Sequence, residues 1–193
     1  LPLTVIAELL GVEPEKRDFF REASVKIAVS LGPMADASVA GRAIDGRNDL
    51  IAYFIDLIQR RKAEPRDDLV SALILAEDRG DILSVGELMA MLILLLVGGH
   101  ETTVNLIGNG LFALLRNPEQ LARLRADDSI EKTAIEELLR FDSPVQYSGR
   151  VARVDFELRG QRIQKGQRVR MILGSANYDP EVFDEPNRLD LAR

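Results

Sequence analysis

The sequence predicts a mainly α-helical protein with a small antiparallel β element near its C-terminal end. Apolar residues recur at helical spacing along most of residues 1–146. After Gln146 the pattern alternates, and turns at Arg159-Gly160 and Lys165-Gly166 interrupt it, which is typical of short antiparallel strands. We therefore expect one domain over residues 1–193, helical in 1–146, with a small β element and irregular coil in 147–193.

Composition narrows the class of protein. The chain has 193 residues, 46% hydrophobic and 29% charged, as soluble globular proteins do. The net charge of −6, with acids and bases interspersed, gives no sign of a nucleic-acid partner. The longest apolar run, Leu88 to Val97, is far shorter than the about 20 residues of a membrane span, so we expect no membrane contact. The sequence has no cysteine, which fits a reducing compartment, and we expect a cytoplasmic location.

Helix start and stop signals divide the first part of the chain. A short helix ends at Gly11, and Pro14 suits the first turn of the next one. The stretch from Gly32 to Gly46 is small, glycine-containing and without period, so we expect a mobile loop there. Further helices are expected from about Leu50 to Glu64, Leu69 to Glu77, Pro118 to Arg125 and Ile130 to Phe141.

A long central helix is expected at residues 84–116. Ser84 and Glu87 form a capping box ahead of the apolar run, and no proline follows until Pro118. Such a helix is about 50 Å long at 1.5 Å per residue. Its first half is apolar on all sides, so we expect it to run through the centre of the domain.

The middle of this helix contains residues that form helices poorly. Gly98 and Gly99 each cost about 1 kcal/mol relative to alanine. They would let a flat or diatomic ligand approach the backbone, while Glu101 and Thr102 form an acid–alcohol pair suited to proton delivery. The alternative is tight helix packing at the two glycines, with Glu101 facing water. His100 has no second histidine with which to build a metal site, and we interpret it as structural or surface-exposed.

Glu137 and Arg140 are three residues apart in IEELLRFDSP and would share one helix face. Most such pairs lie on the surface and contribute a few tenths of a kcal/mol. A buried pair would need further partners to satisfy its charges. Spacing alone favours the surface interpretation.

Taken together, these motifs resemble the cytochrome P-450 superfamily of heme-thiolate monooxygenases, most closely its soluble bacterial members. GGHETT matches the family's central-helix motif, and EELLR contains its E-x-x-R. By this resemblance Glu101 and Thr102 are catalytic, and Gly98, Gly99 and Arg150 contact the heme. Arg188 in DEPNRLD resembles the third member of a buried cluster with Glu137 and Arg140, although Leu189 stands where the family usually has phenylalanine. No metal ligand is found in the chain.

The resemblance covers only the middle part of the family, so we expect an incomplete P-450-like fold with a long central helix, an E-x-x-R helix and β hairpins. It implies oxygen activation and hydroxylation or epoxidation of a small apolar substrate, with electrons from a protein such as a ferredoxin. Heme belongs to the full-length family. The axial cysteine is absent, so we expect this chain to bind none and to be inactive alone. It is open whether the chain acts as an enzyme.

Two other functions stay open. One is a heme-free, catalytically dead homologue that acts as a binding or partner module, and the other is an unrelated helical ligand-binding domain. The apolar stripe between Leu92 and Leu111 also predicts that the isolated chain forms a homo-oligomer.

Overall fold

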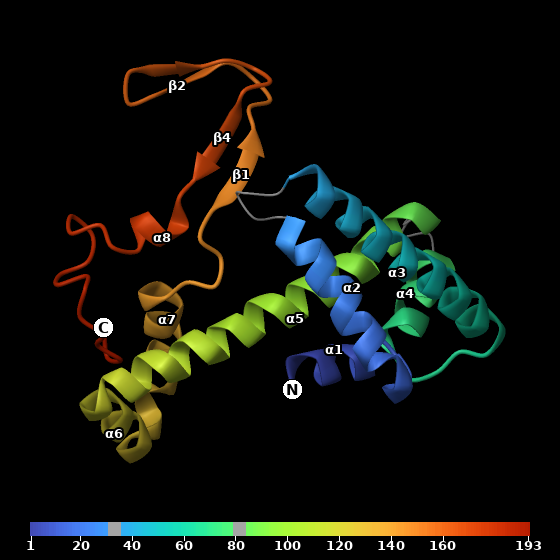
Figure 1. The fold of residues 1–193 in the computed structure, drawn as a ribbon, viewed down its shortest axis with the longest axis horizontal. Helices are drawn as coiled ribbons and strands as arrows, with labels where there is room; N and C mark the ends of the chain where they lie inside the picture. The colour runs from blue at the N-terminus through green and yellow to red at the C-terminus, as the bar shows by residue number, and fades with distance from the viewer. Residues whose placement is uncertain (31–35, 79–83) are drawn as a thin grey trace. The chain divides into compact units, whose positions relative to one another are not determined.

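The computed structural model describes residues 1–30, 36–78 and 84–193, and it confirms a mainly helical chain with small antiparallel sheets (Figure 1). The α-helices are α1 (Pro2–Leu9), α2 (Arg17–Ser30), α3 (Ala37–Ala63), α4 (Leu69–Asp78), α5 (Val85–Arg116), α6 (Pro118–Ala126), α7 (Glu131–Phe141) and α8 (Leu173–Ala176). Two short 3₁₀ turns, η1 (Pro14–Lys16) and η2 (Asp128–Ile130), precede α2 and α7.

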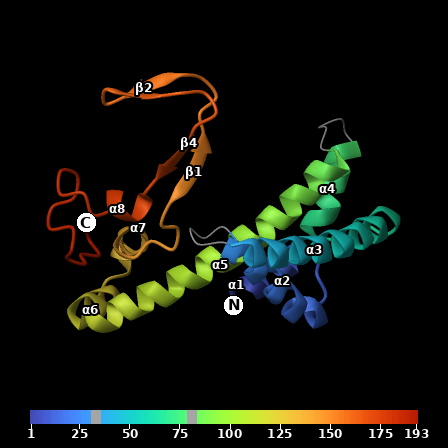
Figure 2. The ribbon, with the colours of Figure 1, turned by 45° about the horizontal axis from the view of Figure 1, so that its top comes forward.

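The described chain packs as two compact units, Leu1–Val104 and Asn105–Arg193. The boundary falls inside α5, the long helix labelled in Figure 2, so each unit contains part of this helix. The sequence analysis instead divided a single domain at residue 146, where helix gives way to strand. That division follows secondary structure, whereas the compact units follow packing.

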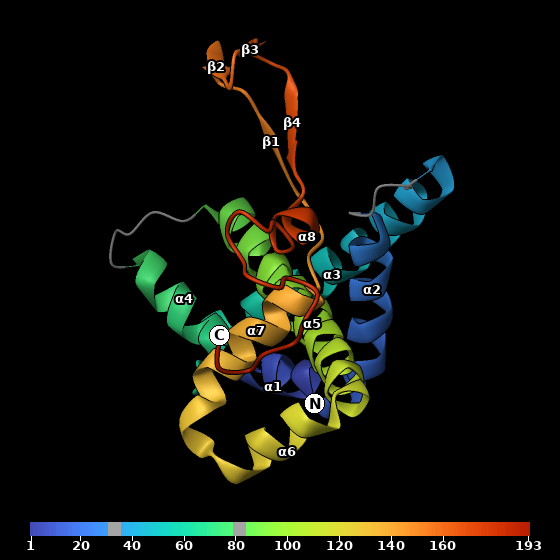
Figure 3. The ribbon, with the colours of Figure 1, turned by 90° about the vertical axis from the view of Figure 1, so that its left-hand side faces the viewer.

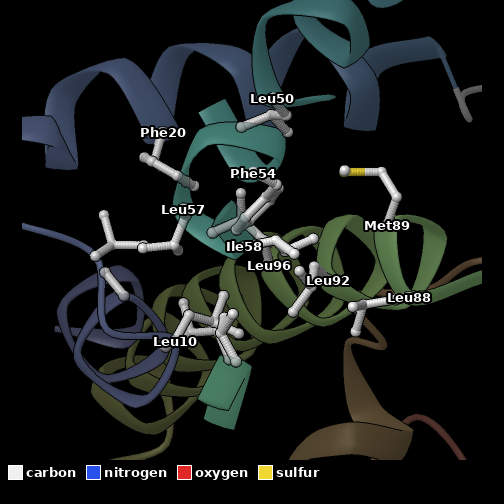
Figure 4. Packing of buried hydrophobic residues seen from close by; sticks show 14 of the residues in the cluster. Leu10, Phe20, Leu50, Phe54, Leu57, Ile58, Leu88, Met89, Leu92 and Leu96 are labelled. Atoms are coloured by element: carbon white, nitrogen blue, oxygen red, sulfur yellow. The ribbon is translucent and has the colours of Figure 1, made fainter. Parts of the chain in front are cut away.

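The first unit has its own apolar core, built from all five of its helices (Figure 4). Helices α2 and α3 pack against each other along much of their length. Aromatic rings meet edge-to-face between them, as with Phe20 and Phe54, whose centroids are 5.6 Å apart. The largest fully buried side chains of this core are Leu10, Phe20, Leu50, Phe54, Leu57, Leu88, Leu92 and Leu96.

The mobile loop predicted from Gly32 to Gly46 is wrong for its described part. Residues 32–35 lie outside the described residues, but α3 already begins at Ala37. The Asp36 side chain caps this helix by accepting a hydrogen bond from the Val39 N–H at 2.8 Å. A Cβ at Gly46 would lie 3.0 Å from the Ala23 carbonyl oxygen, so this glycine allows α3 to approach α2 rather than forming a loop.

Helix α5 matches the predicted long helix closely. The capping box forms: the Ser84 N–H donates to the Glu87 carboxylate at 2.8 Å, and the Glu87 N–H donates to the Ser84 hydroxyl at 3.3 Å. Among the described residues, α5 is the one helix with the length and apolar composition of a membrane span. Its leucines 88, 92 and 96 are nevertheless buried in the core of the first unit.

The second unit contains four short strands, β1 (Ser148–Val151), β2 (Phe156–Leu158), β3 (Gln161–Ile163) and β4 (Arg168–Met171), ahead of α8 and the C-terminal coil. β1 pairs antiparallel with β4, and β2 with β3, as Figure 3 shows beyond α8. Arg159 and Gly160, between β2 and β3, both have positive φ, at 48° and 78°, as a tight hairpin turn requires. The predicted turn there, and the one at Gly166 (φ 89°), are present.

The core of the second unit is smaller and joins helix to irregular coil. Leu189 and Leu191, in the C-terminal coil, are buried against residues of α5 and α7. The Thr133 hydroxyl donates to the Leu191 carbonyl at 2.7 Å, which fixes the coil to the start of α7. The buried residues of this core are Ala113, Leu114, Ile130, Ala134, Leu189 and Leu191.

Candidate functional site

Residues 98–102 of α5, in the first unit, keep their helical backbone despite two adjacent glycines. The Thr102 hydroxyl donates to the Gly98 carbonyl oxygen, with 2.5 Å between the oxygens. A threonine bonded to the carbonyl one turn earlier is a local alternative partner for that carbonyl and favours bending of a helix. The hydroxyl therefore sits where the helix bonding is most easily opened.

The two glycines face different surroundings. A Cβ at Gly98 would have no neighbour within 4 Å, so the backbone there is open to whatever approaches it. A Cβ at Gly99 would lie 3.3 Å from Cγ1 of Ile6 on α1. Gly98 thus suits close approach of a ligand, while Gly99 serves helix packing, which the sequence analysis held as the alternative for both.

Glu101 and Thr102 are both half-buried. Within the described part of the chain, the Glu101 carboxylate makes no hydrogen bond or ion pair. Both of its oxygens are therefore available to accept a proton or a hydrogen bond from water. An acid without a fixed partner beside a hydroxyl is the arrangement needed to relay protons. The acid–alcohol role remains a prediction for these two residues.

His100 lies inside the first unit with only 6% of its surface exposed. Its Nδ1 lies 2.8 Å from the Ser24 hydroxyl of α2. Burial lowers the pKa of His100. The positive charges of Arg21 and the N-terminal amine lower this pKa further, whereas the Glu101 carboxylate raises it. His100 is therefore a buried structural residue, one of the two interpretations that the sequence allowed.

In the second unit, Glu137 and Arg140 form a buried bidentate ion pair, with N–O distances of 2.6 and 2.9 Å. The remaining donors of Arg140 reach backbone carbonyls, including those of Asn177 at 2.8 Å and Pro186 at 2.9 Å. Its guanidinium also lies 5.3 Å from the centre of the Phe183 ring. The surface interpretation that spacing favoured does not apply, because the C-terminal coil folds over the pair.

The charge of Glu137 is held by several donors. Burial by itself would raise the pKa of this carboxyl, but the hydrogen bonds from Arg140 and from the Asp190 N–H, at 3.0 Å, hold the pKa below its usual range. The nearby Arg193 charge acts in the same direction. Glu137 is therefore ionised and fully bonded, as a buried carboxylate must be.

Arg188 does not take the place expected for it in this cluster. Its side chain is 59% exposed and pairs with Glu185 at 3.0 Å, and only its carbonyl oxygen faces Arg140. The third member of the cluster is instead Arg193, whose Nε lies 3.2 Å from the Glu137 carboxylate. The turn at residues 185–188 directs the Arg188 side chain to solvent, and Arg193 returns to the carboxylate. The sequence offers two arginines after Pro186 as candidates, Arg188 and Arg193, and it does not distinguish them.

Arg150, the predicted heme contact, lies exposed on β1 opposite Val169. Its guanidinium bonds to the Ser148 hydroxyl and to the Gly149 carbonyl, both at 2.8 Å. These are neutral acceptors on the same strand, so the charge of Arg150 has no acidic partner within the described residues. The role of Arg150 as a heme contact stays a prediction.

One buried ion pair has no counterpart in the sequence analysis. Arg61 on α3 pairs with Asp68 at 2.5 Å, and both side chains are at least 96% buried. Arg61 also donates to the Gly11 carbonyl, and Asp68 accepts from the Ser71 N–H. Gly11 has φ of 69°, and a Cβ there would collide with the Asp68 carboxylate. The pair joins the ends of α1, α3 and α4, and no sequence spacing signals it.

Arg140 lines two hollows in the second unit, of about 410 and 580 Å³. The residues that line them include Arg116, Phe141 and Asn177. None of the predicted catalytic or heme-contacting residues lines either hollow. We therefore place the candidate chemistry at Gly98–Thr102 by residue type and geometry, and not by hollow size.

Comparison with known proteins decides the family. The sequence profile of the family described as Cytochrome P450 matches residues 31–193. This chain belongs to the cytochrome P450 family. It is 45% identical to cytochrome P450 107B1 of Saccharopolyspora erythraea and 44% identical to vitamin D(3) 25-hydroxylase of Pseudonocardia autotrophica. Both alignments cover 100% of this chain but only 46% and 47% of those P450s, so the chain spans about half of their length.

Solved P450 structures show the same partial coverage. P450BioI, in complex with an acyl carrier protein that carries hexadec-9Z-enoic acid, is 37% identical, with a TM-score of 0.94. CYP164A2 of Mycobacterium smegmatis, with econazole bound, is 38% identical, also at 0.94. Each alignment covers all of this chain and about half of the solved one, 50% and 49%. The fold is that of a partial P450.

The residues of this chain fit only part of a heme site. The open backbone at Gly98, next to the Thr102 hydroxyl, leaves room for a flat ligand, but no cysteine is present to supply a thiolate. His100, the one histidine, is buried and bonded to Ser24. The donors in this chain therefore do not complete the ligand set of a P450 heme.

Proposed function

We propose that this chain is part of a heme-dependent monooxygenase that hydroxylates or epoxidises a small apolar substrate. The observation that carries the proposal is the Gly98–Thr102 segment, with its open backbone and an unpaired carboxylate next to a hydroxyl. In a P450 the heme supplies the redox chemistry of oxygen. By itself the chain lacks the thiolate, and we propose that it is inactive in isolation.

The residues of α5 have separate tasks in this proposal. The absent side chain of Gly98 leaves room against the helix for a diatomic molecule. The Thr102 hydroxyl, which donates to the Gly98 carbonyl in this structure, can turn to hold a water molecule beside the bound ligand. The Glu101 carboxylate can pass a proton between solvent and the Thr102 hydroxyl, because it is half-exposed and has no fixed partner among the described residues.

The experiment uses a full-length chimera in which this chain replaces the aligned part of cytochrome P450 107B1, to which it is 45% identical. We expect Thr102→Ala and Glu101→Gln to lower product formation by about 10²-fold or more, the size of a general acid–base contribution. Thr103→Ala is the matched control, because Thr103 is adjacent and exposed. Equal activity of the Thr102 and Thr103 variants would remove the proposed role of Thr102.

The alternative is a heme-free homologue that acts as a binding or partner module, and the absence of cysteine favours it for the chain taken alone. Titration with hemin, followed by reduction and carbon monoxide, tests the isolated chain. We expect no absorption band of a thiolate-ligated heme. A chimera that also failed to give this band, although it contains the relative's cysteine, would favour the alternative.

We further propose a cytoplasmic protein that receives electrons from a carrier such as a ferredoxin. The bacterial P450s that it resembles support this, including the biotin biosynthesis P450 of Bacillus subtilis at 40% identity. Of the predicted stripe from Leu92 to Leu111, Leu92 and Leu96 are buried in the first unit, so we propose that the isolated chain self-associates through the exposed apolar residues farther along α5. Ile107, Leu111 and Leu115 are 50–63% exposed at helical spacing. Light scattering during size exclusion tests this, and a monomer of 21.5 kDa would contradict it.

A further inference from the structure

A buried polar contact joins α2 to α5 inside the first unit, directly beside the acid–alcohol pair. Ser24 is fully buried and His100 is 6% exposed, with 2.8 Å between the Ser24 hydroxyl and Nδ1 of His100. The same hydroxyl lies 3.0 Å from the Arg21 carbonyl oxygen, one turn earlier on α2. Polar groups at such depth are stable only when their hydrogen bonds are satisfied.

Counting protons assigns the direction of these bonds. The Ser24 hydroxyl has one proton, and the Arg21 carbonyl can only accept. If the hydroxyl donates to Arg21, the imidazole must donate its Nδ1–H to the Ser24 oxygen. This arrangement is the one in which both short contacts are hydrogen bonds, and it leaves Nε2 of His100 without a proton when the ring is neutral.

The charges around the ring favour the neutral form. Burial is the largest influence that lowers the pKa of His100, and Arg21 on α2 and the amine ahead of α1 act in the same direction. Glu101 on α5 opposes them. The ring is therefore uncharged near neutral pH and carries its one proton toward Ser24.

The hydrogen bond between Ser24 and His100 connects residues 98–102 of α5 to a different helix. Within residues 98–102, Thr102 bonds to its own helix, and Glu101 bonds to none of the described residues. The bond to Ser24 is the one side-chain hydrogen bond that ties this segment to another helix in the part of the chain that the structure describes. Rotation of α5 about its axis would break that bond, and it would also turn Glu101 and Thr102.

We propose that Ser24 and His100 are positioning residues, whose hydrogen bond fixes the rotation of α5 and thereby the orientation of Glu101 and Thr102. The purpose of this positioning rests on the proposed function, whereas the contact itself does not. Neither side chain touches reacting atoms in this proposal. His100 acts through α5, as a neutral Nδ1–H donor.

Nitrogen NMR of the isolated chain tests the contact directly, because the sequence has one histidine and therefore one pair of ring nitrogens. Above about pH 7 we expect Nδ1 to carry the proton and Nε2 to be bare. Ser24→Ala should abolish this preference. Ser30→Ala is the matched control, since Ser30 donates to a carbonyl one turn earlier on α2, at 2.6 Å, without a histidine. Acetylation of the N-terminal amine should leave the proton on Nδ1.

Amide hydrogen exchange measures the effect on α5. Loss of one buried hydrogen bond should speed exchange at Glu101 and Thr102 about two- to tenfold in Ser24→Ala and in His100→Leu. His100→Asn keeps an N–H donor near the position of Nδ1 and should restore much of the protection, whereas a purely apolar packing role would favour leucine.

Two results would overturn the proposal: a proton on Nε2 in the native chain, or equal exchange in the Ser24→Ala and Ser30→Ala variants. The ring-nitrogen measurement needs only the native chain, so a variant that fails to fold does not prevent the test. Because no heme is involved, a chimera without monooxygenase activity would contradict the proposed function and leave this contact standing.

Discussion

Residues 98–102 of α5 and the Glu137 cluster of the second unit both carry P450 motifs, yet the chain satisfies them to very different degrees. Glu137 accepts hydrogen bonds from Arg140, Asp190 and Arg193 and is 3% exposed. Around Gly98, by contrast, an added side chain would meet nothing, and the Glu101 carboxylate is unpaired among the described residues. A structural motif is completed by its own chain, whereas a motif for chemistry keeps its polar groups available.

Removing the carboxylate charge from the cluster is the largest expected change. Glu137→Gln leaves Arg140 buried without its counter-ion, and the loss of one partner of a buried pair typically costs about 3–5 kcal/mol. Urea unfolding of the isolated chain measures the cost. The matched control is Glu136→Gln, an exposed neighbour for which we expect a change below about 0.5 kcal/mol. Equal midpoints for both variants would mean that the cluster adds no stability.

The choice between two arginines sharpens the comparison. Arg193→Ala removes a bond to Glu137 and one to the Asp184 carbonyl at 2.6 Å, so we expect a loss of about 1–3 kcal/mol. Arg188→Ala removes exposed ion pairs and should cost less than about 1 kcal/mol. The same unfolding assay compares them. A larger loss for Arg188 would restore the assignment that the sequence analysis made from the family resemblance.

Acid should remove part of the energy that the cluster contributes. The pKa of Glu137 lies below its ordinary value of 4.5 in the folded chain, so the unfolded chain binds more protons as the pH falls. The contribution is complete above about pH 4.5 and is lost progressively as the pH falls through the folded pKa. The difference in unfolding free energy between the native chain and Glu137→Gln should therefore shrink below pH 4.5. A constant difference would show that the pKa is not lowered.

The smallest expected effects separate the two glycines. Gly98→Ala should stabilise the chain by up to about 1 kcal/mol, because alanine favours the helix and the added methyl group meets nothing. Gly99→Ala should gain less or lose stability, since its methyl group would lie 3.3 Å from Ile6. Thermal unfolding of both variants tests this order. If Gly99→Ala were the more stable variant, packing against α1 would not be the reason for that glycine.

Local signals in the sequence determined most of the secondary structure. The Ser84–Glu87 capping box and the absence of proline up to Pro118 placed α5 almost to the residue. The glycine of Arg159-Gly160 predicted the hairpin turn, and both residues have positive φ in the structure. Such signals are read correctly because cap and turn geometry depends on a few neighbouring residues. The start of α3 was missed because the segment from Gly32 to Gly46 has the composition of a loop. Gly46 in fact allows close contact between α3 and α2.

Only the tertiary structure decided which side chains meet. Arg61 reaches Asp68 and the Gly11 carbonyl, 50 residues away in sequence, and Ser24 meets His100 at a separation of 76. Arg193 rather than Arg188 completes the Glu137 cluster because of a turn in the C-terminal coil. Residue type and spacing along a helix identify which groups could bond. The burial that makes those bonds strong arises when distant segments exclude water together, and this depends on the path of the whole chain.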